Sequence, residues 1–262
     1  MSARALRVAL AGEAALDLGR VSGKLTKTGD MVTLEQLSIA SLGGAAVTAA
    51  GISSAKGSHL EVRLEAAQLN DLAALARRFA PGRWSEALEA RARALANAKL
   101  TIKADAAPAP PGQAPALAAL SVDGVVGATK VVVAARPDGP GNLALSLALD
   151  APEAAPLLRQ LGQMPAGGAA LQGATLGPAR VNLAGRLRGD QFDDISADAN
   201  LAGVALIYRG GAAQGKASLK SANLAPLLQA FGLAVTDAGK AAPALAAEAA
   251  ARPAAGARRL VD

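Results

Sequence analysis

The chain has 262 residues, of which 52% are hydrophobic but only 2% aromatic, and its 27 lysines and arginines against 21 aspartates and glutamates give a net charge of +6. This length suffices for one large domain or two ordinary ones, each with a substantial core. Lack of cysteine excludes a disulfide framework, a thiolate nucleophile and a cysteine-ligated metal, and no window holds the roughly 18 to 20 uninterrupted apolar residues of a membrane-spanning helix.

The first clear strands lie between residues 59 and 103. Leu60, Val62 and Leu64 alternate with polar residues, and so do Leu100 and Ile102. Alternation with period 2 places the apolar side chains on one face of a sheet. We therefore predict strands with one apolar face here.

The same alternation returns in the second half of the chain. Its apolar positions are Leu143, Leu145, Leu147, Leu149, Val181, Leu183 and Leu187. Glycine-containing turn sequences separate the strands, at 28–30, 42–44, 138–141 and 209–211. Turns this short join antiparallel neighbours. The sequence thus predicts a mainly β fold of elongated, curved antiparallel sheets.

Three segments switch to the helical spacing of leucine and alanine directly after a strand. They are 69–79, 151–161 and 223–231, and the glycines that follow them are Gly82, Gly162 and Gly232. Such glycines are typical of helix ends. The segments recur at intervals of about 70 to 80 residues, which indicates an internal repeat of several strands closed by one short helix.

This repeat predicts the domain organisation. The expected parts are a first strand-plus-helix module at 1–82, a second at 83–162 with a Pro-rich loop at 107–115, a third at 163–236, and an Ala- and Pro-rich tail at 237–262. No sheet period continues into the tail, which we expect to be disordered or weakly helical.

A search for catalytic or metal-binding residues gives little. His59, the only histidine, stands on the polar side of an alternating strand without a nucleophile nearby in the sequence. Asp193, Asp194 and Asp198 form the densest acidic cluster, but their spacing matches no calcium loop. We predict a protein that is not an enzyme, with no cofactor, no metal and no catalytic residue.

The basic charge raises the alternative of nucleic-acid binding. The densest basic cluster is Arg77, Arg78, Arg83, Arg91 and Arg93. Single-strand binding uses aromatic platforms, and duplex binding uses a concentrated basic surface. One tryptophan, one tyrosine and three phenylalanines are too few for the former. We therefore expect no nucleic-acid partner and interpret the cluster as a solvated surface.

The residues resemble a known family. Three features carry the resemblance: strands of small apolar residues, the Gly-Gly turn within 41–51 and the strand-to-helix joint at 147–162. In these features the sequence looks like the AsmA family of bacterial envelope proteins, also described as AsmA/TamB-type repeating β-groove proteins. The stretches 122–133 and 176–185 are similar to that family's C-terminal repeats. The likeness covers roughly residues 5–233 and rests on the residue types of the strands and turns and on the order of the modules.

The resemblance implies a function. AsmA-like proteins are elongated β-grooves attached to the inner membrane and projecting into the periplasm, and they are implicated in outer-membrane assembly and phospholipid transport. The expected partners are therefore phospholipid and envelope membrane proteins. The family's N-terminal anchor is not recognisable in this sequence, which leads us to expect that the chain is part of a larger AsmA-like protein.

Two interpretations of the apolar face remain open. In the first, the face shields acyl chains, and its candidate lipid-facing residues are Leu60, Val62, Leu64, Leu143, Leu145, Leu147, Leu149, Val181 and Leu183. In the second, the face is filled by the protein's own helices, and the chain is a structural or assembly module without lipid cargo. Both demand the same alternation, so the sequence alone does not separate them.

Overall fold

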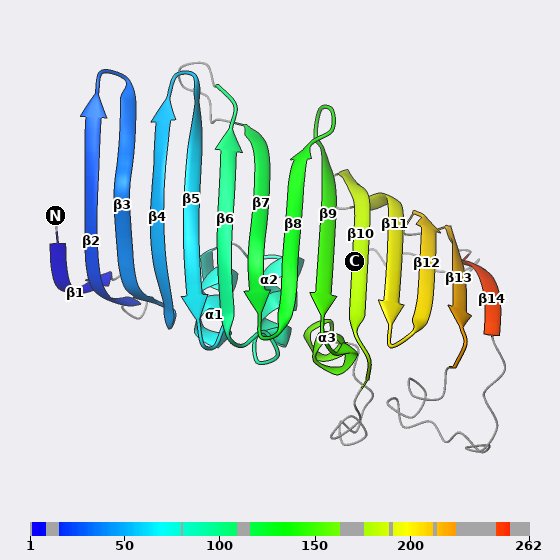
Figure 1. Cartoon of the computed structure of the whole chain (residues 1–262). Helices are drawn as coiled ribbons and strands as arrows, with labels where there is room; N and C mark the ends of the chain where they lie inside the picture. The colour runs from blue at the N-terminus through cyan, green and yellow to red at the C-terminus, as the bar shows by residue number, and fades with distance from the viewer. Residues whose placement is uncertain are drawn as a thin grey trace, which may run out of the picture.

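In the computed structural model, the chain forms a single antiparallel sheet with short helices at one end (Figure 1). The structure describes residues 2–8, 16–79, 81–108, 116–162, 176–188, 191–211, 214–223 and 245–251. These residues form fourteen strands, and each strand pairs with its neighbour in the sequence, from β1 to β14. The prediction of a mainly β, antiparallel fold is confirmed.

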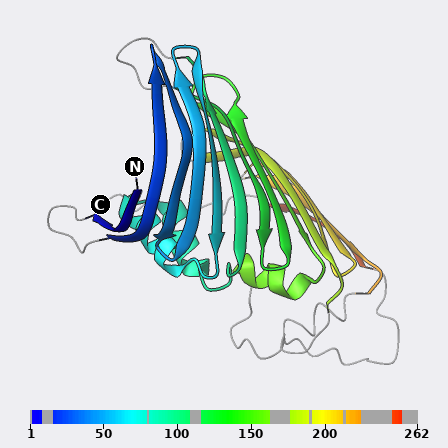
Figure 2. The ribbon, with the colours of Figure 1, turned by 60° about the vertical axis from the view of Figure 1, so that its left-hand side comes forward.

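The strands follow one another as a meander. Their bounds are β1 Ser2–Val8, β2 Leu16–Thr28, β3 Met31–Leu42, β4 Ala45–Ser54, β5 Gly57–Ala66, β6 Ala98–Ala106, β7 Leu117–Val126, β8 Thr129–Pro137, β9 Asn142–Ala151, β10 Ala179–Arg188, β11 Gln191–Leu201, β12 Val204–Gly210, β13 Gly215–Ser221 and β14 Leu245–Ala251. The sheet twists strongly, so that the last strands swing away from the direction of the first (Figure 2). This twist follows from the right-handed preference of L-residues in extended chains.

The three helices interrupt the meander at two places without breaking the sheet. They are α1 Asn70–Phe79, α2 Arg83–Arg91 and α3 Ala154–Gln160. The strands β5 and β6 pair directly, although α1 and α2 lie between them in the sequence. In the same way, β9 pairs with β10 although α3 lies between these two strands. The strand modules therefore share one continuous sheet instead of forming separate ones.

Local sequence explains where the helices begin and end. In α1, Asp71 in the first turn and the basic residues of the last turn complement the helix dipole. At the start of α2, Ser85 Oγ accepts a hydrogen bond from Gly82 N–H at 3.1 Å and donates one to Gly82 O at 2.9 Å. Pro156 falls in the first turn of α3, where the amide it lacks would have no helical partner.

The helices agree with the predicted segments in part. The segment 69–79 forms α1, and 151–161 contains α3, which starts later because β9 continues to Ala151. The helix α2 was not predicted, because Leu88 is the only large aliphatic residue in its sequence, Arg-Trp-Ser-Glu-Ala-Leu-Glu-Ala-Arg. The predicted helix 223–231 lies outside the described residues, apart from Asn223.

Two further predicted segments are described only at their margins. The Pro-rich loop 107–115 leaves the sheet at a hydrogen bond from Ala107 N–H to Ala116 O of 2.8 Å, and 109–115 lie outside the described residues. Within the tail 237–262, where no sheet period was expected, residues 245–251 form β14 against β13. Backbone hydrogen bonds to an open edge do not require a particular side chain, which is why composition missed this strand.

Strand register divides the sheet into two unlike faces. On what we call the apolar face, side chains line up in rows that cross ten strands from β4 to β13. One row is Val47, Leu64, Leu100, Gly124, Val131, Leu149, Val181, Ala199, Leu206 and Leu219. The next is Ala49, Val62, Ile102, Val122, Val133, Leu147, Leu183, Ala197, Tyr208 and Ala217. We call the opposite side the polar face.

The core lies between the helices and one end of the apolar face. The α1–α2 cluster comprises Ala45, Val47, Leu64, Ala66, Leu69, Ala73, Ala92, Ala98 and Val126. The α3 cluster comprises Leu149, Ala151, Ala154, Ala155, Leu157, Leu158, Leu176 and Ala179. Because every helix connects strands at the same end of the sheet, both clusters lie at that end.

One buried hydroxyl near this core has no hydrogen-bond partner among the described residues. It is Oγ1 of Thr129, which is fully buried at the start of β8. A buried hydroxyl without a partner keeps its desolvation penalty. We expect Thr129→Val, which conserves shape, to raise the free energy of unfolding by about 1 kcal/mol in urea titrations. Thr48→Val on the exposed polar face is the matched control; a loss of stability in the Thr129 variant alone would mean that the hydroxyl is satisfied.

Candidate binding face of the sheet

The nine residues predicted to face lipid all lie on the apolar face. Register brings those of β9 and β10 together, with Leu147 opposite Leu183 and Leu149 opposite Val181. Leu60, Val62 and Leu64 are on β5, separated from them by β6, β7 and β8. The two groups are therefore parts of one surface.

The residues that join these two groups were not among the predicted ones. They are Leu100, Ile102, Leu120, Val122, Val131 and Val133, which fill the apolar-face rows on β6, β7 and β8. Leu100 and Ile102 were recognised as strand residues but not as candidates. The alternation of 120–126 and 129–135 was available in the sequence and would have identified the rest.

The helices cover the candidate residues unequally. Leu64 and Leu149 are buried in the α1–α2 and α3 clusters, with exposed fractions of 9% and 7%. Val62 packs against the first cluster, and Leu147 and Val181 against the second. These five residues belong to the protein's own core or to its margin.

The other four candidates form what we call the open strip: Leu60, Leu143, Leu145 and Leu183. None of them belongs to either cluster or packs against one within the described residues. Leu60 is 40% exposed, and the other three are half-buried by their strand neighbours. The apolar face is thus covered by helices at one end and continues beyond them as the open strip.

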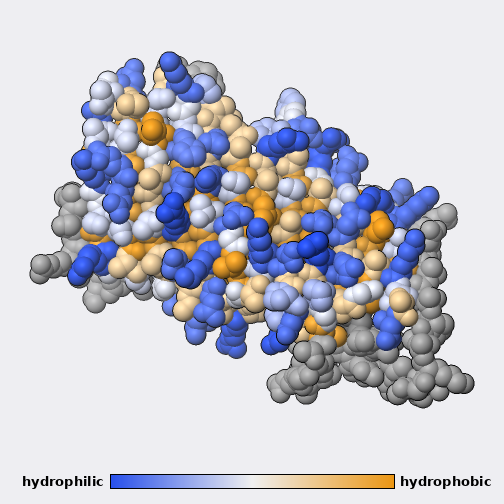
Figure 3. All heavy atoms as spheres, viewed as in Figure 1, coloured by the Kyte–Doolittle hydropathy of each residue, from blue (hydrophilic) through white to orange (hydrophobic). Residues whose placement is uncertain are grey.

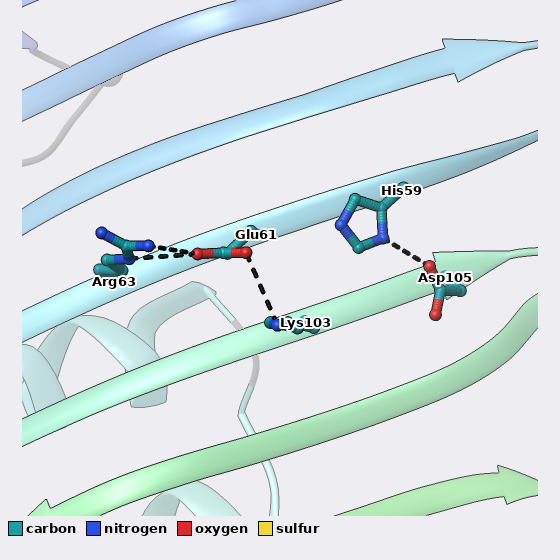
Figure 4. A network of polar contacts seen from close by, with 5 residues as sticks. All are labelled: His59, Glu61, Arg63, Lys103 and Asp105. Atoms are coloured by element: carbon teal, nitrogen blue, oxygen red, sulfur yellow. Dashed lines mark hydrogen bonds and ion pairs between the residues drawn. The ribbon is translucent and has the colours of Figure 1, made fainter.

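The polar face carries charged side chains paired across neighbouring strands (Figures 3 and 4). Glu61 on β5 binds Arg63 on its own strand at 3.0 Å and Lys103 on β6 at 3.8 Å. His59 Nδ1 lies 2.6 Å from Asp105 Oδ1. Exposed pairs of this kind contribute little stability, but opposite charges on facing positions favour the observed register.

Among the described residues, the structure places one polar partner at the His59 ring, the carboxylate of Asp105. Its partner Asp105 is 46 residues away in the sequence, which is why the sequence did not reveal the pair. In the network of Figure 4, His59 contacts Asp105, while Glu61 contacts the two cations. A histidine–carboxylate pair needs a nucleophile or bound water on the other ring nitrogen to act in hydrolysis, and this network contains no hydroxyl or thiol group.

Acidic residues of the cluster considered for metal binding form ion pairs with different arginines. Asp194 lies 3.2 Å from Arg186, and Asp198 lies 2.9 Å from Arg209. Arg186 also binds Asp138 at 2.6 Å, and this hydrogen bond raises the pKa of the guanidinium above its ordinary value. Among the residues that the structure describes, no group of three or more His, Cys, Asp or Glu side chains is placed to hold a metal ion.

The basic cluster near the helices is partly neutralised. Arg77 on α1 binds Glu89 on α2 at 2.6 Å, and the hydrogen bond raises the pKa of Arg77. The neighbouring Arg78 lies over the ring of Phe79, 5.4 Å from its centre. None of the described helices is long and apolar enough to cross a membrane.

The fold and its two faces define the class of protein: an open, meandering antiparallel sheet whose apolar face bears helices at one end. No family model, curated protein or solved structure matches the chain. Its resemblance to AsmA proteins therefore stays a prediction from the residues.

Proposed function

We propose that this chain is a non-enzymatic scaffold of the AsmA type that shields the acyl chains of phospholipid on its apolar face. The observation that carries the proposal is the open strip, which extends the apolar rows beyond the helices. In this proposal the protein works in the periplasm, attached to the inner membrane through the larger protein, and supports outer-membrane assembly together with envelope membrane proteins.

The physical argument rests on the shape and chemistry of the face. Moving one methylene group out of water lowers the free energy by roughly 0.8 kcal/mol. An extended acyl chain therefore binds any continuous apolar strip of sufficient length. The open strip extends from β5 to β10, and with strands spaced about 4.8 Å apart these six strands provide a path of roughly 24 Å. Branched and linear aliphatic side chains supply this surface without specific polar contacts, which suits a scaffold better than a catalyst.

A second candidate function is a structural or assembly module with a core filled by its own helices. The burial of Leu64 and Leu149 beneath the helices favours it. This alternative requires the open strip to be covered by a protein partner or by other parts of the chain. The two functions differ in one measurable property, the lipid that the folded chain carries.

The test is mass spectrometry of lipids that co-purify with the chain from a bacterial envelope. We expect stoichiometric phospholipid with the wild type. In the double variant Leu60→Asp and Leu183→Asp we expect about tenfold less lipid or a greater loss, because a carboxylate facing an acyl chain is desolvated without a partner.

The matched control is Thr48→Asp with Thr101→Asp, which adds the same charge to the polar face opposite Arg63. This control should carry as much lipid as the wild type, and circular dichroism should find all three proteins folded. If the folded wild type carries no phospholipid, the filled-core function replaces the proposed one.

A further inference from the structure

The polar face contains a hollow of about 500 Å³ over β6 to β10. Its lining includes the charged residues Lys103, Asp105 and Arg136 together with alanine and serine residues. Leu120 and Leu145, whose strand positions belong to the apolar face, also contribute to the lining. Figure 3 shows tan and orange groups between blue charged groups near the middle of this face. Most of its lining residues occupy strand positions of the polar face, opposite to the side chains of the open strip.

Strand register explains why the surface is hollowed here. A row of small side chains crosses five strands: Ser121, Ala134, Ser146, Ala184 and Ser196. Lys103 continues this row at one end and Arg209 at the other. Lys103 lines the hollow, whereas Ser196 and Arg209 lie outside its lining, so the floor consists of Ser121, Ala134, Ser146 and Ala184. At about 4.8 Å per strand, this floor is roughly 14 Å long.

Arg136 is the unusual charge at this hollow. It is exposed and lies opposite Ala144 on β9, and no carboxylate pairs with it in the part of the chain that the structure describes. The nearby charges are already occupied, since Lys103 binds Glu61, Asp105 binds His59, and Arg186 binds Asp138. The guanidinium of Arg136 is therefore available to an anion.

We propose that this hollow binds a free aliphatic carboxylate. The guanidinium of Arg136 receives the carboxylate through two parallel N–H···O bonds, the geometry that arginine offers and lysine does not. The aliphatic chain lies along the floor of Ser121, Ala134, Ser146 and Ala184, where side chains without charge let it approach the sheet. Electrostatic complementarity selects the anion, and the floor of small uncharged side chains leaves room for a linear aliphatic body.

The site is separate from the acyl-binding face of the proposed function. The two lie on opposite faces of one sheet, and successive side chains of a strand point to opposite faces. A ligand of the hollow therefore does not compete with phospholipid on the open strip, and the two proposals stand or fall independently.

The experiment is isothermal titration of the full chain with decanoate, below the concentration at which decanoate forms micelles. We expect saturable binding at one site. Arg136→Gln is expected to weaken it about tenfold or more, since a charge-assisted bidentate pair is lost, and Arg136→Lys to weaken it less. Arg136 is exposed and unpaired, so both variants keep the fold, which circular dichroism checks.

Two controls make the result specific. Arg188→Gln removes another exposed arginine, at the end of β10 and outside the hollow, and should leave the decanoate affinity unchanged. Decanol, the uncharged counterpart, should bind wild type and Arg136→Gln equally. The proposal is overturned if wild type does not bind decanoate, if Arg136→Gln binds it as the wild type does, or if Leu60→Asp with Leu183→Asp abolishes the binding instead.

Discussion

Replacing Leu157 by alanine is expected to lower the free energy of unfolding by about 2 to 5 kcal/mol. Leu157 in α3 is fully buried and lies in the α3 cluster with Leu149 and Leu176. Truncation removes three buried carbon atoms and leaves a cavity that a short helix on a flat sheet fills only in part. Urea titration followed by far-ultraviolet circular dichroism measures the change.

Arg159→Ala is the control for this effect because Arg159 lies on the exposed side of the same helix. We expect it to change the stability by no more than about 0.5 kcal/mol. Equal stability of the Leu157 variant and the wild type would contradict the position of α3 on the sheet. It would also mean that Leu149 belongs to the open strip, which would extend the surface available to acyl chains.

Gly124→Ala is expected to destabilise the centre of the sheet by about 1 to 3 kcal/mol or more. Gly124 in β7 stands in the apolar-face row between Leu100 and Val131. A Cβ at this position would overlap the backbone oxygen of Lys99 and lie 2.9 Å from Leu100 Cα. Backbone atoms of a paired strand move only if the ladder separates, so β6 and β7 would lose hydrogen bonds.

Gly177→Ala serves as the comparison, because a Cβ there meets Ala202 Cα at 3.8 Å, an ordinary contact distance. Thermal unfolding of the two variants separates a specific clash from the general effect of replacing glycine. Hydrogen exchange should increase in β6 and β7 of the Gly124 variant. Unchanged protection of these strands would mean that β7 pairs with β6 in another register.

Period-2 alternation was sufficient to predict the strands around Leu60 and Leu145 and the face to which their leucines belong. Such alternation is a property of the extended chain itself, so it is readable from a few consecutive residues. The helix α2 was missed because its sequence carries too few aliphatic residues for a helical stripe. It is stabilised instead by packing Leu88 against the α1–α2 cluster.

Strand register places the candidate residues on one face, and their role in facing lipid stays a prediction, but the surroundings of each residue were not predictable from the sequence. Sequence treats Leu145 and Leu149 alike, since both occupy the same phase of β9. The structure buries Leu149 beneath α3 and leaves Leu145 in the open strip. The difference arises from the end of the strand at which the helix docks, which depends on the whole meander.

The hollow and the pair of His59 with Asp105 illustrate the same limit on the polar face. Ser121 and Ala184 are far apart in the chain and become parts of one floor only when four strands align. By itself the sequence determined the strand content, the apolar face and the lack of a recognisable catalytic motif, because these depend on local pattern and composition. Which leucines the helices cover, and whether a carboxylate reaches Arg136 among the described residues, depended on the tertiary structure, because register and helix docking are set by contacts between residues distant in the chain.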